Sequence, residues 1–219
     1  AEQNAIDNAR ENINNSNLFV SLEPCSHFGK TPPCTNSIIK NKIKNVFYGM
    51  EDVDTRSKNK CTKIFNKKGI YVKSNFLKKE VKKMYKSYIY VKKHNLPYVT
   101  GKIACSKNYI INSENKYLTN DHSLKVSHLL RYKNQGILIS YKTLNNDNPI
   151  LNCRLSGLEK FSPIRFVIDK NLDVKLSSKI IKTADKYKTI VFYNKNINKK
   201  KKIHYLKQRN IRLVNLPVD

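Results

Sequence analysis

Short apolar runs alternate with helix-patterned segments along nearly the whole chain, and this alternation limits the fold more than any other feature. In the first third, apolar runs at residues 18–22, 46–48 and 70–72 have the length of strands. Before and between them, residues 1–11, 35–42 and 62–68 carry apolar side chains at helical spacing. Such alternation is typical of α/β folds, so we predict a layered α/β domain here.

The same alternation returns after a long, basic, helix-patterned stretch at residues 76–93, which ends before Pro97. Strands are predicted at residues 98–104, 136–140, 164–168, 189–193 and 211–214. Helices are predicted at 122–133, with Asn120 or Asp121 as the N-cap, and from the lysine run at 199–202 onward. The 219 residues therefore divide into a first domain at 1–75, a connecting helix at 76–95 and a second domain at 96–219.

The net charge of +27, from 43 Lys and Arg against 16 Asp and Glu, raises the question of nucleic-acid binding. Only seven of these basic residues are arginine, the residue that grips phosphate and guanine bidentately. The lysines are spread over every predicted element instead of gathering on one face. Because Lys and Asn have A+T-rich codons, the charge favours drift in an A+T-rich genome over a nucleic-acid partner.

The sequence also bears on the cellular setting. The first residues are polar, with no apolar core of a signal peptide behind them, and no apolar run reaches the roughly 18–20 residues that a membrane helix needs. Five cysteines without a secretion signal argue against a disulfide framework. We therefore expect a cytoplasmic protein with no membrane partner, in which some cysteines bind a metal.

The residues that carry chemistry form one loop, Leu22-Glu23-Pro24-Cys25-Ser26-His27-Phe28-Gly29-Lys30-Thr31-Pro32-Pro33-Cys34. Cys25 and Cys34 each follow a proline, which lacks an N–H and fixes φ. A Pro-Cys pair at a helix start holds its thiolate where the helix N-terminus favours negative charge. Two such thiolates make half of a tetrahedral zinc site, and the alternative is a pair of plain buried thiols.

Glu2 opens the first predicted helix. Zinc nucleobase deaminases place His-x-Glu on one helix and two cysteines at the next, and their Glu moves protons instead of binding zinc. Glu2 fits this Glu, and the histidine would be the residue directly before Ala1. Taken by itself, Glu2 is equally consistent with a solvated acid in a first helical turn.

The loop is similar to the deaminase signature of the bifunctional RibD-type family of riboflavin biosynthesis, Pro-Cys-Ser-His-x-Gly-x-Thr-Pro-Pro-Cys after a His-Ala-Glu helix. Most other zinc nucleobase deaminases separate their two cysteines by two residues, whereas eight residues separate Cys25 from Cys34. The resemblance continues at Glu51-Asp52 and, in the second half, at residues 102–106, 113–119, 128–131, 143–154 and 163–169.

This resemblance implies an α/β fold in which a cytidine-deaminase-like three-layer domain precedes a dihydrofolate-reductase-like domain. It implies that both domains are truncated, because the family's first strands and zinc histidine and its C-terminal segment are not in this sequence. The implied activities are zinc-dependent hydrolytic deamination of a phosphoribosylated diaminopyrimidinone and then NADPH-dependent reduction of its ribosyl group to ribityl.

The resemblance also implies roles for individual residues. Cys25 and Cys34 would bind Zn²⁺, and Glu2 would be the proton shuttle. Arginine suits bidentate phosphate binding, which favours a ligand-binding role for Arg131 and Arg154; the alternative is that each caps a helix or pairs with an acid. The substrate would contact His27, Lys30, Asn115, Arg131, Leu151 and Arg154, and NADPH would lie along Ala104, Tyr117, Thr143, Asp147 and Lys170.

Several positions depart from the family pattern. Asn59-Lys60-Cys61 replaces a Gly-x-Gly turn, Asn108-Tyr109 replaces an Asp-Gly turn, and Asn115 and Tyr117 stand where the family has Ser and Trp. Two alternatives stay open: a nucleic-acid base deaminase, which the high charge would suit but the eight-residue cysteine spacing opposes, and a non-catalytic remnant whose basic surface binds RNA, which the substituted turns favour. We expect a small-molecule phosphoribosyl substrate and no nucleic-acid partner, and the sequence leaves homo-oligomerisation open.

Overall fold

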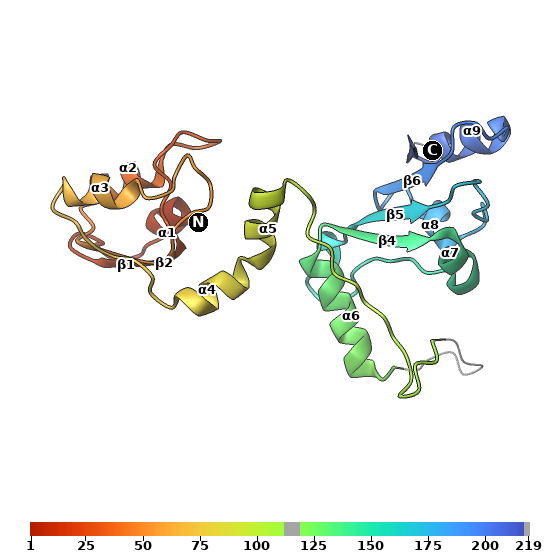
Figure 1. Cartoon of the computed structure of the whole chain (residues 1–219), viewed down its shortest axis with the longest axis horizontal. Helices are drawn as coiled ribbons and strands as arrows, with labels where there is room; N and C mark the ends of the chain where they lie inside the picture. The colour runs from red at the N-terminus through yellow and green to blue at the C-terminus, as the bar shows by residue number, and fades with distance from the viewer. Residues whose placement is uncertain (112–118, 217–219) are drawn as a thin grey trace. The chain divides into compact units, whose positions relative to one another are not determined.

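Two parallel sheets, each with its own helices, make up the structure, a computed structural model that describes residues 1–111 and 119–216 (Figure 1). The chain divides into two compact units, residues 1–102 and residues 103–219. Each unit contains one sheet and one hydrophobic core. The predicted α/β character is confirmed for both halves.

The first unit has the three-stranded sheet order β1-β2-β3. All pairs are parallel, with Phe19 opposite Phe47 and Phe47 opposite Lys73. The strands are β1 (Asn17–Leu22), β2 (Asn45–Met50) and β3 (Tyr71–Lys73), and the helices are α1 (Glu2–Asp7), α2 (Cys34–Lys40), α3 (Cys61–Asn66), α4 (Lys78–Met84) and α5 (Lys86–His94).

Alternate residues of β2 separate the two faces of this sheet. Val46 and Tyr48 are buried against Ile38 of α2 and Phe65 of α3, which forms the core of the unit. On the opposite face, a side chain at Gly49 would collide with Val81 of α4. Helices therefore lie on both faces, and the sheet forms the middle layer.

The long helix predicted at residues 76–93 is interrupted at Tyr85, which ends α4 and begins α5. The Tyr85 hydroxyl hydrogen-bonds the Ser21 hydroxyl at 2.9 Å, and the Tyr88 hydroxyl donates to Asp52 Oδ1 at 2.7 Å. Tyr85 thus fastens the break between the two helices to β1, and Tyr88 fastens α5 to the loop after β2.

The second unit has the four-stranded parallel order β4-β5-β6-β7. Helix α6 (Asp121–Lys133) begins at the predicted N-cap, because the Asn120 side chain accepts from the backbone N–H of Ser123. The remaining elements are β4 (Gly136–Ser140), α7 (Tyr141–Asp147), a 3₁₀ turn (Glu159–Phe161), β5 (Ile164–Ile168), α8 (Lys179–Lys182), β6 (Thr189–Tyr193), α9 (Lys200–Gln208) and β7 (Ile211–Asn215).

A buried arginine fastens the loops around the core of this unit. Arg165 on β5 is fully buried, and its guanidinium donates to the carbonyls of Ile150, Ile180, Thr183 and Tyr187 and to the hydroxyls of Thr183 and Thr189. Burial lowers its pKa to about 10, which leaves it charged at neutral pH. Dipoles of carbonyls and hydroxyls, not an acid, compensate this charge.

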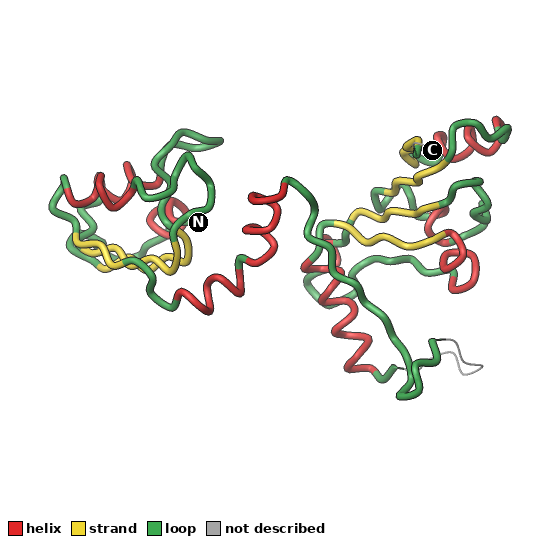
Figure 2. Tube along the Cα trace, viewed as in Figure 1, coloured by secondary structure: helices red, strands yellow, loops and turns green. Residues whose placement is uncertain are grey.

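The strand predicted at residues 98–104 is wrong, because this segment is irregular (Figure 2). Its apolar side chains are solvent-exposed, with Val99 at 81% and Ile103 at 73%. Within the described residues, no strand pairs with it. Alternating apolar residues make a strand only where a neighbouring strand accepts their backbone hydrogen bonds.

Candidate functional site

The cysteine loop of the first unit is held in place by Glu23, the residue two before Cys25. Its carboxylate is 2% exposed and accepts hydrogen bonds from four backbone N–H groups, those of Asp52, Asn59, Lys60 and Cys61, at 3.0–3.2 Å. These donors lie in the loop after β2 and in the first turn of α3. Glu23 therefore ties the cysteine loop to the end of the sheet.

Cys25, Cys34 and Glu2 come together although they lie on three different segments. Cys34 is the first residue of α2, after Pro33, and its backbone N–H donates to Cys25 Sγ at 3.2 Å. The thiol of Cys34 donates to Glu2 Oε2 at 3.4 Å, from the first turn of α1. Only Cys34 stands at a helix start, since Cys25 lies in the preceding loop. The prediction of a helix start for both cysteines is wrong.

The surroundings of Cys34 keep its thiol protonated in the absence of a cation. Burial, the hydrogen bond with Cys25 and the charge of Glu2 raise the pKa of Cys34 to about 12. A bound cation would reverse this preference, because metals bind the thiolate. Among residues 1–111 and 119–216, however, no three His, Cys, Asp or Glu side chains form a group that could hold a metal. Cys25, Cys34 and Glu2 thus bring two thiols and a carboxylate together without forming such a group.

The other predicted residues of this loop differ in how firmly they are held. His27 Nδ1 hydrogen-bonds the hydroxyl of Ser57, a fully buried residue, at 2.9 Å. Lys30 is exposed at the tip of the loop. Ser26 stands between Cys25 and His27 in the sequence, and its Oγ is buried without a hydrogen-bond partner among the described residues. A buried hydroxyl of this kind is a polar group that a ligand could satisfy.

In the second unit, Arg131 and Arg154 converge on the same two residues, His128 and Asn152. Arg131 Nη1 lies 3.1 Å from His128 Nδ1 and 3.4 Å from the Asn152 carbonyl oxygen. Arg154 donates through its backbone N–H to His128 Nδ1 at 3.2 Å and through Nη1 to Asn152 Oδ1 at 3.1 Å. Leu151, another predicted residue, is buried beside Asn152 with a φ of 62°.

The alternative that each arginine pairs with an acid finds no support in the part of the chain that the structure describes. The ion pairs there involve other residues. Burial and the charge of Arg154 lower the pKa of Arg131, so the two guanidiniums repel each other. Two neighbouring cations without an anion form a surface that favours a phosphate.

The predicted NADPH residues lie elsewhere in this unit. Thr143 and Asp147 belong to α7, a helix that forms because Ser140 Oγ caps it by accepting from the Thr143 N–H. Lys170 follows β5, and Ala104 lies in the irregular segment before α6. Asn115 and Tyr117 lie outside the described residues.

Four supporting residues were missed by sequence reasoning: Glu23, Ser57, His128 and Asn152. Each acts through another residue, and three of them stand next to or within a motif that was recognised. His128 precedes Arg131 by three residues on a predicted helix, a spacing that places both side chains on one face. That spacing is the one signal that could have identified a partner in advance.

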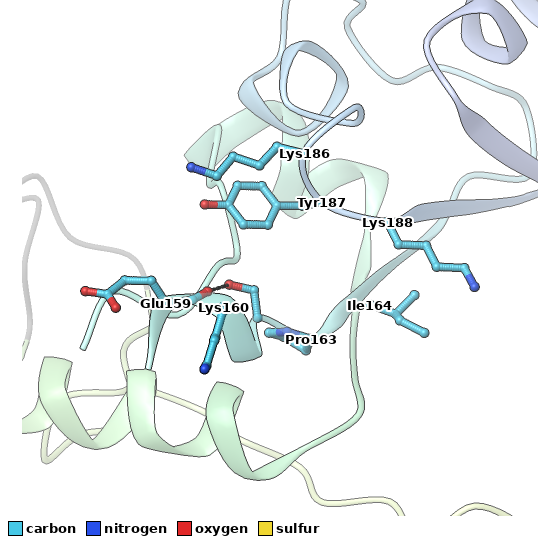
Figure 3. Close-up of a pocket in the computed structure, with 8 residues that line it drawn as sticks. Glu159, Lys160, Pro163, Ile164, Lys186, Tyr187 and Lys188 are labelled. Atoms are coloured by element: carbon cyan, nitrogen blue, oxygen red, sulfur yellow. Dashed lines mark hydrogen bonds between the residues drawn. The ribbon is translucent and has the colours of Figure 1, made fainter. Parts of the chain in front are cut away.

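A cavity of about 380 Å³ lies in the second unit, and Asn152 connects it to Arg131 and Arg154. The hydroxyl of Tyr187, which lines the cavity, accepts from Asn152 Nδ2 at 3.0 Å. None of the predicted site residues lines it. Its lining consists of Glu159, Lys160, Ser162, Pro163, Ile164, Lys186, Tyr187 and Lys188 (Figure 3).

None of the helices in the described part of the chain combines the length and the apolar character required to cross a membrane.

Two family models match the chain, one in each half. The zinc-binding region of cytidine and deoxycytidylate deaminases matches residues 1–50. The RibD C-terminal domain matches residues 101–218. The first match contains Glu2, Cys25 and Cys34, and the second contains Arg131 and Arg154.

Curated relatives align with most of this chain, across both of its halves. The riboflavin biosynthesis protein RibD of Bacillus amyloliquefaciens is 34% identical over 184 residues, 83% of this chain and 49% of the relative. That of Aquifex aeolicus is 32% identical over 217 residues, 98% of this chain and 60% of the relative. The chain thus spans about half to three-fifths of the length of these relatives.

Solved structures agree with this assignment. A diaminohydroxyphosphoribosylaminopyrimidine deaminase/5-amino-6-(5-phosphoribosylamino)uracil reductase from Thermotoga maritima superimposes with a TM-score of 0.75 at 28% identity, over 99% of this chain and 67% of that one. Acinetobacter baumannii RibD, form 2, shares the fold, with a TM-score of 0.80 at 22% identity over 100% of this chain and 60% of that one. Because the RibD C-terminal domain model alone covers more than half of its length, the chain belongs to the RibD family.

Proposed function

We propose that the chain carries parts of both activities of riboflavin biosynthesis found in its relatives. The first unit would deaminate a phosphoribosylated diaminopyrimidinone by hydrolysis, in a cytidine-deaminase-like fold. The second unit, with a dihydrofolate-reductase-like fold, would then reduce the ribosyl group to ribityl with NADPH. The order of the two family matches along one chain supports this pairing, as do the two activities for which the Thermotoga maritima protein is named.

The observation that carries the proposal is the meeting of Cys25, Cys34 and Glu2 at hydrogen-bond distance from three separate segments. Two thiols of this kind fit zinc, and the orphaned Ser26 hydroxyl beside them fits a polar ligand. Cys25 and Cys34 would hold Zn²⁺, together with a histidine that we propose directly before Ala1. Zinc bound there would supply an activated water.

Glu2 would move the proton that deamination requires. Water adds to the carbon that bears the exocyclic amine, and the bond from this carbon to nitrogen then breaks. The Glu2 carboxylate would accept the proton from the attacking water and pass it to the leaving nitrogen, which departs as ammonia. His27, which Ser57 holds by its Nδ1, and Lys30 would contact the substrate.

In the second unit, Arg131, Leu151 and Arg154 would bind the substrate together with Asn115. Ala104, Tyr117, Thr143, Asp147 and Lys170 would lie along NADPH, the hydride donor. Thr143 and Lys170 follow the carboxyl ends of β4 and β5, and parallel sheets usually bind ligands at this edge. This placement fits a dinucleotide. The substrate would be a small molecule, with no nucleic acid involved.

The test begins with zinc. We would compare zinc content after dialysis for this chain and for the chain with a histidine restored before Ala1 within the preceding segment of a relative. The restored protein should retain stoichiometric zinc, and Cys25→Ser and Cys34→Ser should each lose it. Equal zinc in both unmodified chains would contradict the proposed third ligand.

The proton role of Glu2 can be separated from metal binding in the restored protein. Glu2→Gln should keep zinc but release ammonia from the substrate at least about 100-fold more slowly, because the carboxamide cannot carry the proton. Glu11→Gln, in an exposed segment, is the matched control. Ammonia release unaffected by Glu2→Gln would rule out the shuttle, whereas joint loss of zinc would make Glu2 a ligand.

A further inference from the structure

His128 offers one ring nitrogen to both arginines of the second unit. Its Nδ1 lies 3.1 Å from Arg131 Nη1 and 3.2 Å from the backbone nitrogen of Arg154. Arg131 lies three residues further along the same helix, whereas Arg154 comes from the loop before β5. A single acceptor atom therefore joins two segments at this point.

Arg131 Nη1 lies closer to Nδ1, at 3.1 Å, than to Nε2, at 3.5 Å, and the donor and acceptor roles at Nδ1 have one consistent assignment. A guanidinium and a backbone N–H can only donate hydrogen bonds, so Nδ1 must be the unprotonated nitrogen that accepts both. The proton of the neutral ring is then on Nε2. A protonated Nδ1 would point an N–H at two further N–H groups and break both bonds.

The charges around the ring act in the same direction. Arg131 on α6 and Arg154 on the loop are the charged groups that face His128, and the nearby thiol of Cys153 donates to the His128 carbonyl at 3.7 Å. His128 is 9% exposed. Burial and the two guanidiniums lower its pKa, which keeps the ring neutral at pH 7.

Both arginines retain donors after these contacts. Arg131 uses Nη1 and Arg154 uses Nη1 and its backbone nitrogen, and within residues 1–111 and 119–216 no partner is recorded for the Nε or Nη2 of either. Arg131 is half-buried and Arg154 is exposed. Each guanidinium thus keeps one Nε–Nη2 edge, the edge that binds a phosphate bidentately.

We propose that His128 is a positioning residue, whose unprotonated Nδ1 holds Arg131 and Arg154 so that their free edges bind the phosphate of a phosphoribosyl ligand. Asn152 completes the arrangement, since its carbonyl oxygen accepts a hydrogen bond from Arg131 and its Oδ1 accepts one from Arg154. The inference rests on the proposed function because it assumes a phosphorylated ligand. It adds the residue that brings together two like charges which would otherwise separate.

The test uses ribose 5-phosphate as the probe, titrated calorimetrically against the whole chain. Removal of the acceptor in His128→Leu should weaken binding by roughly tenfold or more, because the Arg131 and Arg154 donors lose their shared partner. His128→Gln, which offers a side-chain oxygen, should retain most of the affinity. The matched control is His122→Leu, at an exposed position on the same helix, and it should leave the affinity unchanged.

Three outcomes separate this inference from the proposed function. Loss of binding in Arg131→Ala with unchanged binding in His128→Leu would overturn the role of His128 and leave the phosphate site intact. Failure of the unmodified chain to bind ribose 5-phosphate would overturn this inference and the proposed substrate site of the second unit, while zinc content and ammonia release would still test the first unit. If His128→Leu does not fold, ¹⁵N NMR of the histidine ring in the unmodified chain decides, because a proton on Nδ1 at pH 7 would overturn the inference.

Discussion

Glu23 shows how one buried carboxylate can organise the loop that carries candidate site residues. Its carboxylate accepts hydrogen bonds from four backbone N–H groups, which lie in the loop after β2 and at the start of α3. This segment also contains Ser57, the hydroxyl that holds His27. The residue before the Pro-Cys pair therefore determines where the cysteines and His27 lie relative to the sheet.

Glu23→Ala should lower the free energy of unfolding of the first unit by at least about 2 kcal/mol, because several buried donors lose their acceptor. Urea denaturation followed by tyrosine fluorescence would measure this. Glu11→Ala, at an exposed position, should change stability by no more than about 0.5 kcal/mol. Equal effects of the two substitutions would contradict a structural role for Glu23.

Three family glycines are replaced in this chain, and two of these positions, Asn59 and Tyr109, keep a left-handed backbone, whereas Cys61 begins α3. Asn59 has a φ of 58° and Tyr109 a φ of 62°, both in the left-handed region. Asparagine tolerates this region, whereas tyrosine does so with strain. Tyr109 closes a tight turn in which its N–H donates to the Ser106 carbonyl and the Ser106 N–H donates to Ile110.

Tyr109→Gly should therefore raise the free energy of unfolding of the second unit by up to about 1 kcal/mol, since glycine reaches positive φ without strain. The neighbouring Lys107 does not have a positive φ, so Lys107→Gly should instead lower it by about 0.5–1 kcal/mol. Thermal unfolding of both variants gives the comparison. A gain in both, or a loss in both, would show that φ at residue 109 is not the cause.

At the scale of elements, α4 approaches β2 at a single glycine. A side chain at Gly49 would collide with Val81 of α4 and would lie 2.7 Å from the carbonyl oxygen of Ser21 on β1. Gly49→Ala should accordingly cost about 1–3 kcal/mol of stability. Gly101, where a side chain would meet nothing within 4 Å, provides the control Gly101→Ala.

The double substitution Gly49→Ala with Val81→Ala separates the two contacts. It should recover only part of the loss, because the backbone carbonyl of Ser21 cannot move away as a side chain can. Chemical denaturation of the unmodified chain, the two single variants and the double variant gives a complete double-mutant cycle. Full recovery would assign the whole effect to Val81, and no recovery would assign it to the strand.

Helix α5 is attached to the loop after β2 by ionic contacts. Asp54 Oδ2 lies 2.7 Å from Arg56 Nη2 and 2.8 Å from Lys92 Nζ of α5. The Arg56 and Lys92 side chains, which donate hydrogen bonds to this carboxylate, hold its pKa well below its usual range. A group with a lowered pKa in the folded state stabilises the fold above its ordinary pKa of 3.8, and this contribution is lost as the pH falls further.

Asp54→Asn should thus be less stable than the unmodified chain at pH 7, and the difference should shrink as the pH falls below about 4. Unfolding curves between pH 7 and pH 3 would show it. Lys92→Ala should reproduce part of the difference, and the exposed neighbour Lys93→Ala should not. A gap that stays constant over this range would mean that Asp54 acts through packing instead of charge.

On the scale of the whole molecule, the arginines argue against a nucleic-acid footprint despite the charge of +27. Arg165 is fully buried, Arg56 pairs with Asp54, and Arg131 contacts His128. These residues serve the fold or the candidate phosphate site. The remaining positive charge is largely lysine, which binds phosphate as a point charge without bidentate specificity.

We expect no sub-micromolar binding of single-stranded or duplex RNA at physiological salt. Any weak binding at low salt should weaken steeply as salt rises. The logarithm of the association constant should fall by about 0.7–0.9 per phosphate contact for each tenfold rise in salt concentration. Fluorescence anisotropy at several salt concentrations measures this. Tight binding that persists at physiological salt would favour the RNA-binding alternative.

The sequence by itself determined the strands, most of the helices and the chemistry of the candidate residues. Apolar periodicity located every strand that the described residues form, because each is a short apolar run bounded by turn residues. Asn120 was identified as a cap from its own side chain. The spacing of Cys25 and Cys34 predicted metal chemistry, because the two thiols lie close together along the chain.

Only the tertiary structure decided which distant groups meet. Residues 98–104 look like a strand but lack a pairing partner among the described residues. The stretch at 76–93 breaks at Tyr85, where two tyrosines hydrogen-bond β1 and the loop after β2. The contacts of Glu23 and His128 join segments more than 20 residues apart. Local periodicity reports how a segment buries its own side chains, whereas the partner of a hydrogen-bonding group is selected by the packing of the whole unit.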